Sequence, residues 1–140
     1  MTKRSVSLAI HRLRTAEVLL VQRPEDDEEL PLVWGLPAAS LGPGEGWEEA
    51  VRRAGRDKLG VVVEPEGVLR GGVLDRPSYR LEMRLYGARI AAGEPAVPQD
   101  VTGVTQYRAW RWGPASELTA AAGRGSLCSR LYLDWSGAGG

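Results

Sequence analysis

The side chains best suited to chemistry are gathered in one segment, residues 45–59. Glu45 opens this segment, Arg53 lies in its middle, and Asp57 and Lys58 lie near its end. Carboxylates are the oxygen ligands that hard divalent cations prefer, whereas guanidinium and ammonium groups bind phosphates and carboxylates. The segment therefore combines groups that hold a cation with groups that hold an anion.

Chemistry that depends on sulfur or imidazole has little support. Cys128 is the one cysteine and His11 the one histidine. An internal disulfide, a His-rich or four-ligand zinc site and any mechanism with two histidines are therefore excluded. We interpret both residues as packing residues, so function must rest on carboxylates, arginines, hydroxyls or backbone groups.

Length and charge restrict the class of protein. The 140 residues are 43% hydrophobic and 26% charged, which is typical of a packed chain, and we expect one domain over 1–140 with a loose tail at 136–140. Eighteen basic residues balance eighteen acidic ones, so no net field attracts duplex nucleic acid or a membrane surface. No apolar run approaches the roughly 18 residues of a membrane span, and we expect a cytoplasmic protein.

The apolar spacing predicts strands on both sides of one helix. Alternation over 5–13 and 17–23 indicates two strands, which we expect to pair as a hairpin. The spacing becomes helical over 45–59, and Gly60 is placed to end that helix. Residues 79–86 alternate strictly between apolar and charged side chains, which is typical of a half-buried strand.

The second half of the chain predicts further strands and two more helices. Two short apolar runs lie within 61–75, and 104–112 is expected to be a strand. Pro114 is placed to begin a short helix that reaches about Ala122, and Ser126 to cap the last helix. This order of elements indicates a mixed α/β or α+β sandwich.

An acidic run, Glu25 to Glu29, follows the second strand. Its five consecutive carboxylates either gather a cation or stay hydrated. We favour a solvated loop because like charges in a run repel each other.

Residues 39–61 resemble the Nudix box. That motif is a glycine, five residues, a glutamate, seven residues, then Arg-Glu, an apolar residue, any residue, Glu-Glu, any residue, a glycine and an apolar residue. Laid on this chain without gaps, it matches at Glu45, Arg53, Gly60 and Val61. The resemblance implies a Nudix-like α/β/α sandwich with a mixed central sheet. It also implies metal-assisted hydrolysis of a nucleoside diphosphate linked to another moiety.

This chain differs from the Nudix box at the positions that bind the metal. In the family, three glutamates on one helix face hold Mg²⁺ or Mn²⁺, and here those positions are Ala54, Asp57 and Lys58. The opening glycine is replaced by Ala39. By resemblance, Glu45 and Asp57 remain as metal ligands. Mg²⁺ or Mn²⁺ is the cofactor expected of an active enzyme, and no metal is expected of an inactive one.

The resemblance also assigns roles within the box. Glu45, Arg53 and Asp57 form the catalytic set, although a Glu45–Arg53 ion pair would orient the loop against the helix even without catalysis. Asp57 is either the last metal ligand or an i+4 partner of Arg53. Lys58 is assigned to substrate binding, where its ammonium either holds a phosphate or neutralises Asp57; the other interpretation is a solvated surface lysine.

Two further candidates for substrate binding lie outside the box. Trp34, like Trp47, Trp110 and Trp112, either stacks on a nucleobase or packs in the core. Glu82 lies on the charged face of its strand. There it either lines the ligand cleft as a substitute base or simply covers an outer face.

Two functions therefore stay open. The first is a Nudix-type hydrolase with a weakened or altered metal site, which would recruit Asp75 or Asp100 as a further carboxylate. The alternative is a catalytically inactive Nudix-fold domain that binds a nucleotide or nucleoside diphosphate derivative or has a regulatory role, because Ala54 and Lys58 replace two glutamates. A pure interaction domain is a third hypothesis, and the tryptophan-bearing strand faces leave a homodimer open.

Overall fold

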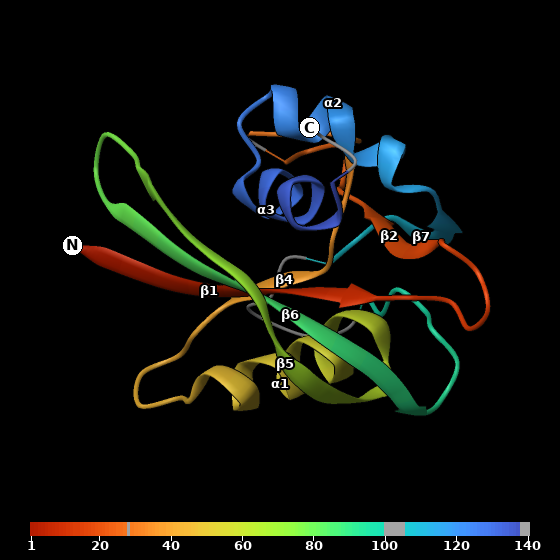
Figure 1. Cartoon of the computed structure of the whole chain (residues 1–140). Helices are drawn as coiled ribbons and strands as arrows, with labels where there is room; N and C mark the ends of the chain where they lie inside the picture. The colour runs from red at the N-terminus through yellow and green to blue at the C-terminus, as the bar shows by residue number, and fades with distance from the viewer. Residues whose placement is uncertain (28, 100–105, 138–140) are drawn as a thin grey trace.

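Strands and helices follow one another through the computed structural model, which describes residues 1–27, 29–99 and 106–137 (Figure 1). The strands are β1 (Thr2–Ile10), β2 (Val18–Gln22), β3 (Trp34–Gly35), β4 (Ala38–Ser40), β5 (Val62–Asp75), β6 (Arg80–Ala92) and β7 (Ala109–Gly113). The helices are α1 (Trp47–Leu59), α2 (Thr119–Gly123) and α3 (Leu127–Ser136), with a 3-10 helix, η1, at Ala115–Leu118.

The main sheet is mixed and has the strand order β4-β1-β6-β5. β1 runs parallel to β6, from Thr2 opposite Arg80 to Ile10 opposite Ala88. β5 pairs antiparallel with β6 as a long hairpin, and β4 pairs antiparallel with β1. A second sheet, β3-β2-β7, is antiparallel throughout.

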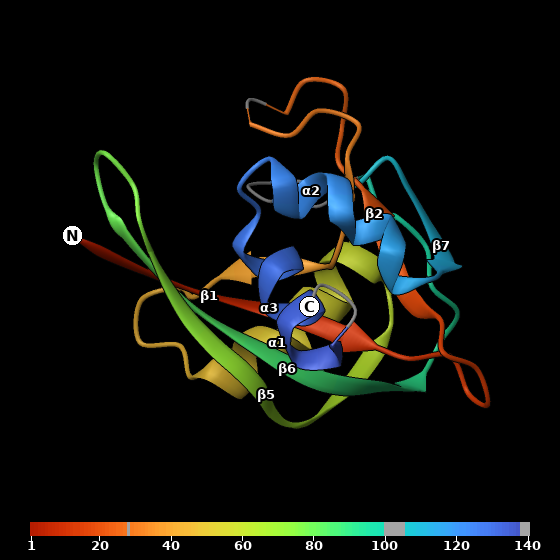
Figure 2. The same cartoon turned by 45° about the horizontal axis from the view of Figure 1, so that its top comes forward.

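Helices cover both faces of the main sheet. Figures 1 and 2 show α1 on one face and α2 with α3 on the other. One core cluster, around Val6, Leu8 and Val51, includes residues of the sheet and of α1. A second cluster, around Leu85 and Leu131, includes residues of β6 and α3. The expected α/β/α sandwich with a mixed sheet is confirmed.

β1 and β2 do not form the hairpin that the sequence predicts. The turn between them contains an isolated bridge from His11 to Val18, together with a backbone hydrogen bond from Arg12 N to Glu17 O of 2.9 Å. β4 and β6 already occupy the two edges of β1. β2 therefore turns away and pairs in the second sheet.

Local signals set the two ends of α1. Gly46 precedes the first turn in an extended conformation, and its N–H donates to Glu49 Oε1 at 3.4 Å. Gly60 adopts φ 66°, the left-handed conformation that favours glycine. The helix therefore ends at Leu59 as predicted and begins at Trp47, two residues later than predicted.

The region 61–75 forms one strand instead of two short ones. β5 runs through Val62–Asp75 and absorbs Pro65 and Gly67 as an irregularity in its register with β6. A proline lacks the N–H that an inner strand needs, but β5 is an edge strand and tolerates it.

The C-terminal helices agree with their predicted signals. Pro114 precedes η1, and Ser126 Oγ accepts a hydrogen bond from Ser129 N at 3.4 Å at the start of α3. Residues 104 and 105 of the predicted strand, and 138–140 of the predicted tail, lie outside the described residues. None of the helices in the described ranges is long and apolar enough to cross a membrane.

The contact between α1 and β5 yields a prediction about Gly55. A Cβ at this position would lie 2.6 Å from Cγ2 of Val63, which is 1% exposed. Gly55→Ala gains about 1 kcal/mol of helix propensity, but overpacking of this kind costs about 1–3 kcal/mol. We expect a net loss of unfolding free energy on the order of 1 kcal/mol by urea denaturation.

Gly123→Ala is the matched control, because no atom lies within 4 Å of its Cβ position. Adding Val63→Ala to Gly55→Ala should reduce the loss that the glycine substitution causes. A Gly55→Ala protein as stable as the wild type would contradict the tight contact.

Candidate functional site

Arg53 ties together three parts of the chain. Its Nε and Nη2 donate to Glu45 Oε2 and Oε1 at 2.8 and 2.9 Å, and Nη2 also donates to Ser40 O at 2.6 Å. Glu45 Oε1 accepts a further hydrogen bond from Gly42 N at 3.0 Å. The ion pair therefore holds the loop that precedes α1 against both β4 and the middle of the helix.

The same contacts fix the charge of both partners. The side-chain hydrogen bonds from Arg53 lower the pKa of Glu45, and those to Glu45 raise the pKa of Arg53. The two side chains are only 17% and 26% exposed, so solvent weakens the pair little. Glu45 is therefore ionised at neutral pH, with both carboxylate oxygens engaged.

A cavity of about 780 Å³ lies next to β4. Its walls come from the start of β1, the loop after β2, β4, the end of α1, the β5–β6 turn and the start of α3. The charged and amide side chains that line it are Lys3, Arg23, Asp26, Asp27, Glu29, Lys58, Arg76, Gln99 and Gln106. A second hollow shares Lys3 and Ser40 with this cavity and is lined by Glu45.

Lys58 contributes an ammonium group to this cavity. The residue is 8% exposed, and its Nζ lies 5.0 Å from the centroid of the Tyr107 ring. Burial, with the positive charges of Arg23 and Arg53, lowers the pKa of Lys58 to about 8, although Asp57 opposes the shift. Lys58 is therefore mostly protonated at pH 7, and its interpretation as a solvated surface lysine is wrong.

Of the described residues in the acidic run, Glu25, Asp26 and Glu29 are exposed, as expected of a solvated loop, and Asp27 is partly buried. Asp27 Oδ1 accepts hydrogen bonds from the N–H groups of Glu29 and Leu30, and its Oδ2 accepts one from Arg23 Nε at 2.9 Å. Burial raises the pKa of Asp27, but these hydrogen bonds outweigh it and lower the pKa overall. The loop is thus folded back on itself beside the cavity, with Glu28 outside the described residues.

A comparison with models of known domain families identifies the family of this chain. The model of the NUDIX domain matches residues 1–134. The chain belongs to the Nudix family. No curated protein sequence matches it.

Solved structures share the Nudix fold at low sequence identity. A NUDIX hydrolase from Nitrosomonas europaea is 17% identical with a TM-score of 0.75, over 99% of this chain and 90% of that one. A MutT protein from Methanosarcina mazei Go1 is 16% identical with a TM-score of 0.70, over 96% and 89%. An ADP-ribose pyrophosphatase from Streptococcus suis 89-1591 is 19% identical with a TM-score of 0.60, over 81% and 75%.

The three departing positions of this Nudix box have different surroundings. Ala54 is fully buried in the core cluster that α1 shares with the sheet. Asp57 Oδ1 accepts a hydrogen bond from Arg56 Nε at 3.2 Å, and its negative charge also acts on Arg53, whose pKa it helps to raise. Of the three, Lys58 is the one that lines the cavity.

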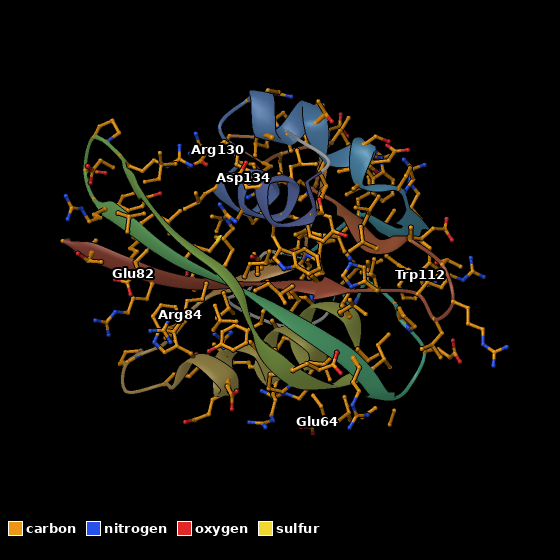
Figure 3. The ribbon with its side chains drawn as sticks, in the orientation of Figure 1. Glu64, Glu82, Arg84, Trp112, Arg130 and Asp134 are labelled. Atoms are coloured by element: carbon orange, nitrogen blue, oxygen red, sulfur yellow. The ribbon has the colours of Figure 1, made fainter. Side chains whose placement is uncertain are left out.

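Glu82 does not line the cavity of this Nudix chain. Leu81 and Met83 face the cavity, and side chains alternate along a strand, so Glu82 points to the opposite face. There its Oε1 lies 3.9 Å from Arg4 Nε. Figure 3 shows Glu82 and Arg84 on the side of the sheet that α1 covers. The proposed role of Glu82 as a base in the cleft is therefore not supported.

Trp34 does not line the cavity either. The guanidinium carbon of Arg111 lies 4.3 Å from the centroid of the Trp34 indole, and Trp34 packs against the α3-side core. Trp110 and Trp112 make an edge-to-face contact, with centroids 6.1 Å apart, against the other core cluster. The packing interpretation fits these three side chains.

Asp75, a further carboxylate proposed from the sequence, does not line the cavity. Asp75 Oδ1 accepts a hydrogen bond from Arg80 Nε at 2.7 Å, and both side chains are exposed beside the β5–β6 turn. Asp100 lies outside the described residues.

Sequence reasoning missed three side chains of the cavity wall. Tyr107 donates its hydroxyl to Ala38 O at 3.4 Å and accepts from Ala38 N at 2.9 Å, and burial raises its pKa to about 12. Arg76 Nε and Gln106 Nε2 are buried without a hydrogen-bond partner. All three lie outside the strands and meet at the cavity from segments that are far apart in the sequence, so no local spacing signals them.

The ion pair of Glu45 predicts a pH-dependent contribution to stability. Because the folded state lowers the pKa of Glu45 below its ordinary 4.5, this contribution is complete above that pH and is lost as the pH falls through the folded-state pKa. Glu45→Gln should reduce the unfolding free energy at pH 7 by about 1–3 kcal/mol. The difference from wild type should narrow below about pH 4.5.

Urea denaturation from pH 7 to pH 3 measures this difference. Glu48→Gln is the control, since Glu48 is exposed in the first turn of the same helix and should change stability by no more than about 1 kcal/mol. A Glu45→Gln deficit that is the same at pH 7 and pH 3 would show that the ion pair is not its cause.

Proposed function

We propose that this Nudix domain binds a nucleoside diphosphate derivative in the cavity without turning it over by ordinary magnesium-dependent hydrolysis. The observation that carries the proposal is the buried ammonium of Lys58 in the cavity wall, at a box position where the family has a glutamate. A diphosphate needs positive charge beside it, and Lys58 supplies that charge from the protein itself.

The box residues of this chain do not fit a magnesium ion. Mg²⁺ requires near-octahedral oxygen coordination with at least one or two available carboxylates. Both oxygens of Glu45 are engaged by Arg53, and the carboxylate of Asp57 pairs with Arg56. Within the described ranges, no three or more His, Cys, Asp or Glu side chains are grouped so as to hold a metal. The donor set therefore supports metal-free binding.

The cavity suits a ligand of this class. Its volume of about 780 Å³ lies in the range of small-molecule and cofactor sites, roughly 300–1,000 Å³. Asp27 lines the same cavity but is paired with Arg23. In the described part of the chain, no carboxylate forms a hydrogen bond or an ion pair with Lys58. Its ammonium is therefore available to a phosphate oxygen. The similar structure from Streptococcus suis is an ADP-ribose pyrophosphatase, which makes ADP-ribose a reasonable first probe.

A second candidate is slow or altered metal-assisted hydrolysis. The observation in its favour is that Asp26, Asp27 and Glu29 line the same cavity as Lys58. Asp27 is committed to Arg23 and two backbone N–H groups, which leaves two exposed carboxylates for a cation. Asp26 and Glu29 could coordinate the same metal ion only if the bound ligand drew their carboxylates together.

Replacing Lys58 tests the proposed function. In EDTA, we expect wild type to bind ADP-ribose measurably by isothermal titration calorimetry. Lys58→Met keeps a long side chain but removes the charge, so it should weaken binding about tenfold or more. Lys58→Arg keeps the charge and should bind within about threefold of wild type.

Two controls separate binding from folding. Lys58→Met removes a buried, unpaired charge, so it should be at least as stable as wild type in thermal unfolding. Arg52→Met removes an exposed cation of the same helix that does not line the cavity, and it should bind like wild type. The proposal would be contradicted if ADP-ribose binding required Mg²⁺ or if its affinity were unchanged in Lys58→Met.

A further inference from the structure

A second basic region lines the cavity at the turn between β5 and β6. Arg76 and Tyr79 belong to this turn, and Lys3 comes from the start of β1. Figure 1 shows the turn extending beyond the body of the fold, close to the N-terminal end of β1. Lys58 enters the same cavity from the end of α1. Besides Arg23 of the loop after β2, the cavity therefore receives basic side chains from the end of α1 and from the region around the β5–β6 turn.

The turn holds Arg76 in place. Arg76 N donates to Tyr79 O at 2.8 Å, and Arg80 N donates to Met1 O at 2.8 Å, which attaches the turn to β1. The Asp75–Arg80 ion pair of 2.7 Å occupies the neighbouring carboxylate. The backbone around Arg76 is thus fixed before any ligand arrives.

The side chain of Arg76 has no partner of its own. Its Nε is buried and makes no hydrogen bond, and within the described ranges no carboxylate lies within ion-pair distance of its guanidinium. A buried guanidinium nitrogen without an acceptor is costly. The nearby Lys3 Nζ lies over the Tyr79 ring, 4.4 Å from the centroid, and likewise has no ion pair there. Arg76 Nε therefore lacks an acceptor, and Lys3 adds a second, exposed cation beside it.

We propose that Arg76, assisted by Lys3, binds a second acidic group of the ligand, separate from its diphosphate. This inference rests on the proposed function, because it assumes that the diphosphate lies at Lys58. The preferred ligand is then a nucleoside diphosphate linked to a moiety that carries its own carboxylate or phosphate. A neutral moiety would leave Arg76 Nε buried and unpaired, and would bind less tightly.

The acidic residues of the cavity do not replace this ligand group. Asp27 is engaged by Arg23. Asp26 and Glu29 are exposed residues of the loop after β2, which Figure 2 shows as a projection separate from the β5–β6 turn. Neither of them forms an ion pair with Arg76 or Lys3 in the described part of the chain.

A matched pair of ligands tests the inference. UDP-glucuronic acid differs from UDP-glucose by one carboxylate, and NADP⁺ differs from NAD⁺ by one phosphate. We expect wild type to bind the more acidic member of at least one pair about tenfold more tightly in calorimetry without metal. A preference within the first pair identifies a carboxylate as the group, and one within the second pair identifies a phosphate.

Arg76→Gln should abolish this preference while leaving the affinity for the less acidic member within about twofold of wild type. Arg70→Gln is the matched control, because Arg70 is an exposed residue of β5 that does not line the cavity; it should keep the preference. Equal binding within both pairs in wild type, or a preference that persists in Arg76→Gln, overturns the subsite but not the proposed function. If no member of either pair binds, the proposed function fails and the subsite fails with it.

Discussion

The bidentate contact between Arg53 and Glu45 is the constraint on which the site depends. It joins the loop before α1 to the middle of the helix, and the additional hydrogen bond to Ser40 O attaches both to β4. β4 lines the cavity, and α1 carries Lys58 into its wall. Both oxygens of Glu45 are used in this contact, which positions the cavity wall. We propose that this structural role replaces the metal binding that the resemblance assigns to Glu45. The Arg53–Glu45 ion pair can fulfil this structural role in a protein that has no catalytic activity.

Burial of Lys58 follows from that arrangement and places an ammonium group in the cavity wall. α1 turns Ala50, Val51 and Ala54 into the core, and Lys58 lies on the same buried side of the helix. Its ammonium is desolvated and has guanidinium groups nearby, which lowers its pKa to about 8. Such a charge is costly when it is alone, and an anionic ligand would relieve that cost. The same reasoning applies to the unpaired nitrogen of Arg76.

The sequence correctly predicted the features that depend on interactions between residues close together in the chain. Gly60 and Ser126 mark helix boundaries because a left-handed residue and a side-chain cap act within one turn, and the Arg53–Glu45 contact joins residues eight apart across one helix start. The features that the sequence did not predict depend on how elements far apart in the chain pack and pair with one another. β1 has no free edge for β2, and the direction of Glu82 depends on which face of β6 meets the cavity. Arg76 reaches the cavity from a segment that is far along the chain from its other walls, which no local pattern reports.

We propose that the cleft of this Nudix fold binds a diphosphate through a protein cation and does not hydrolyse it by ordinary magnesium-dependent attack. The most direct measurement is phosphorus NMR of wild type with a small excess of ADP-ribose, first in EDTA and then after addition of Mg²⁺ or Mn²⁺. On this proposal, we expect diphosphate resonances that are perturbed by the protein in EDTA and stay intact for hours after the metal is added. Conversion of the diphosphate into two phosphate monoesters on adding metal would contradict it, and would mean that carboxylates outside the box complete a metal site.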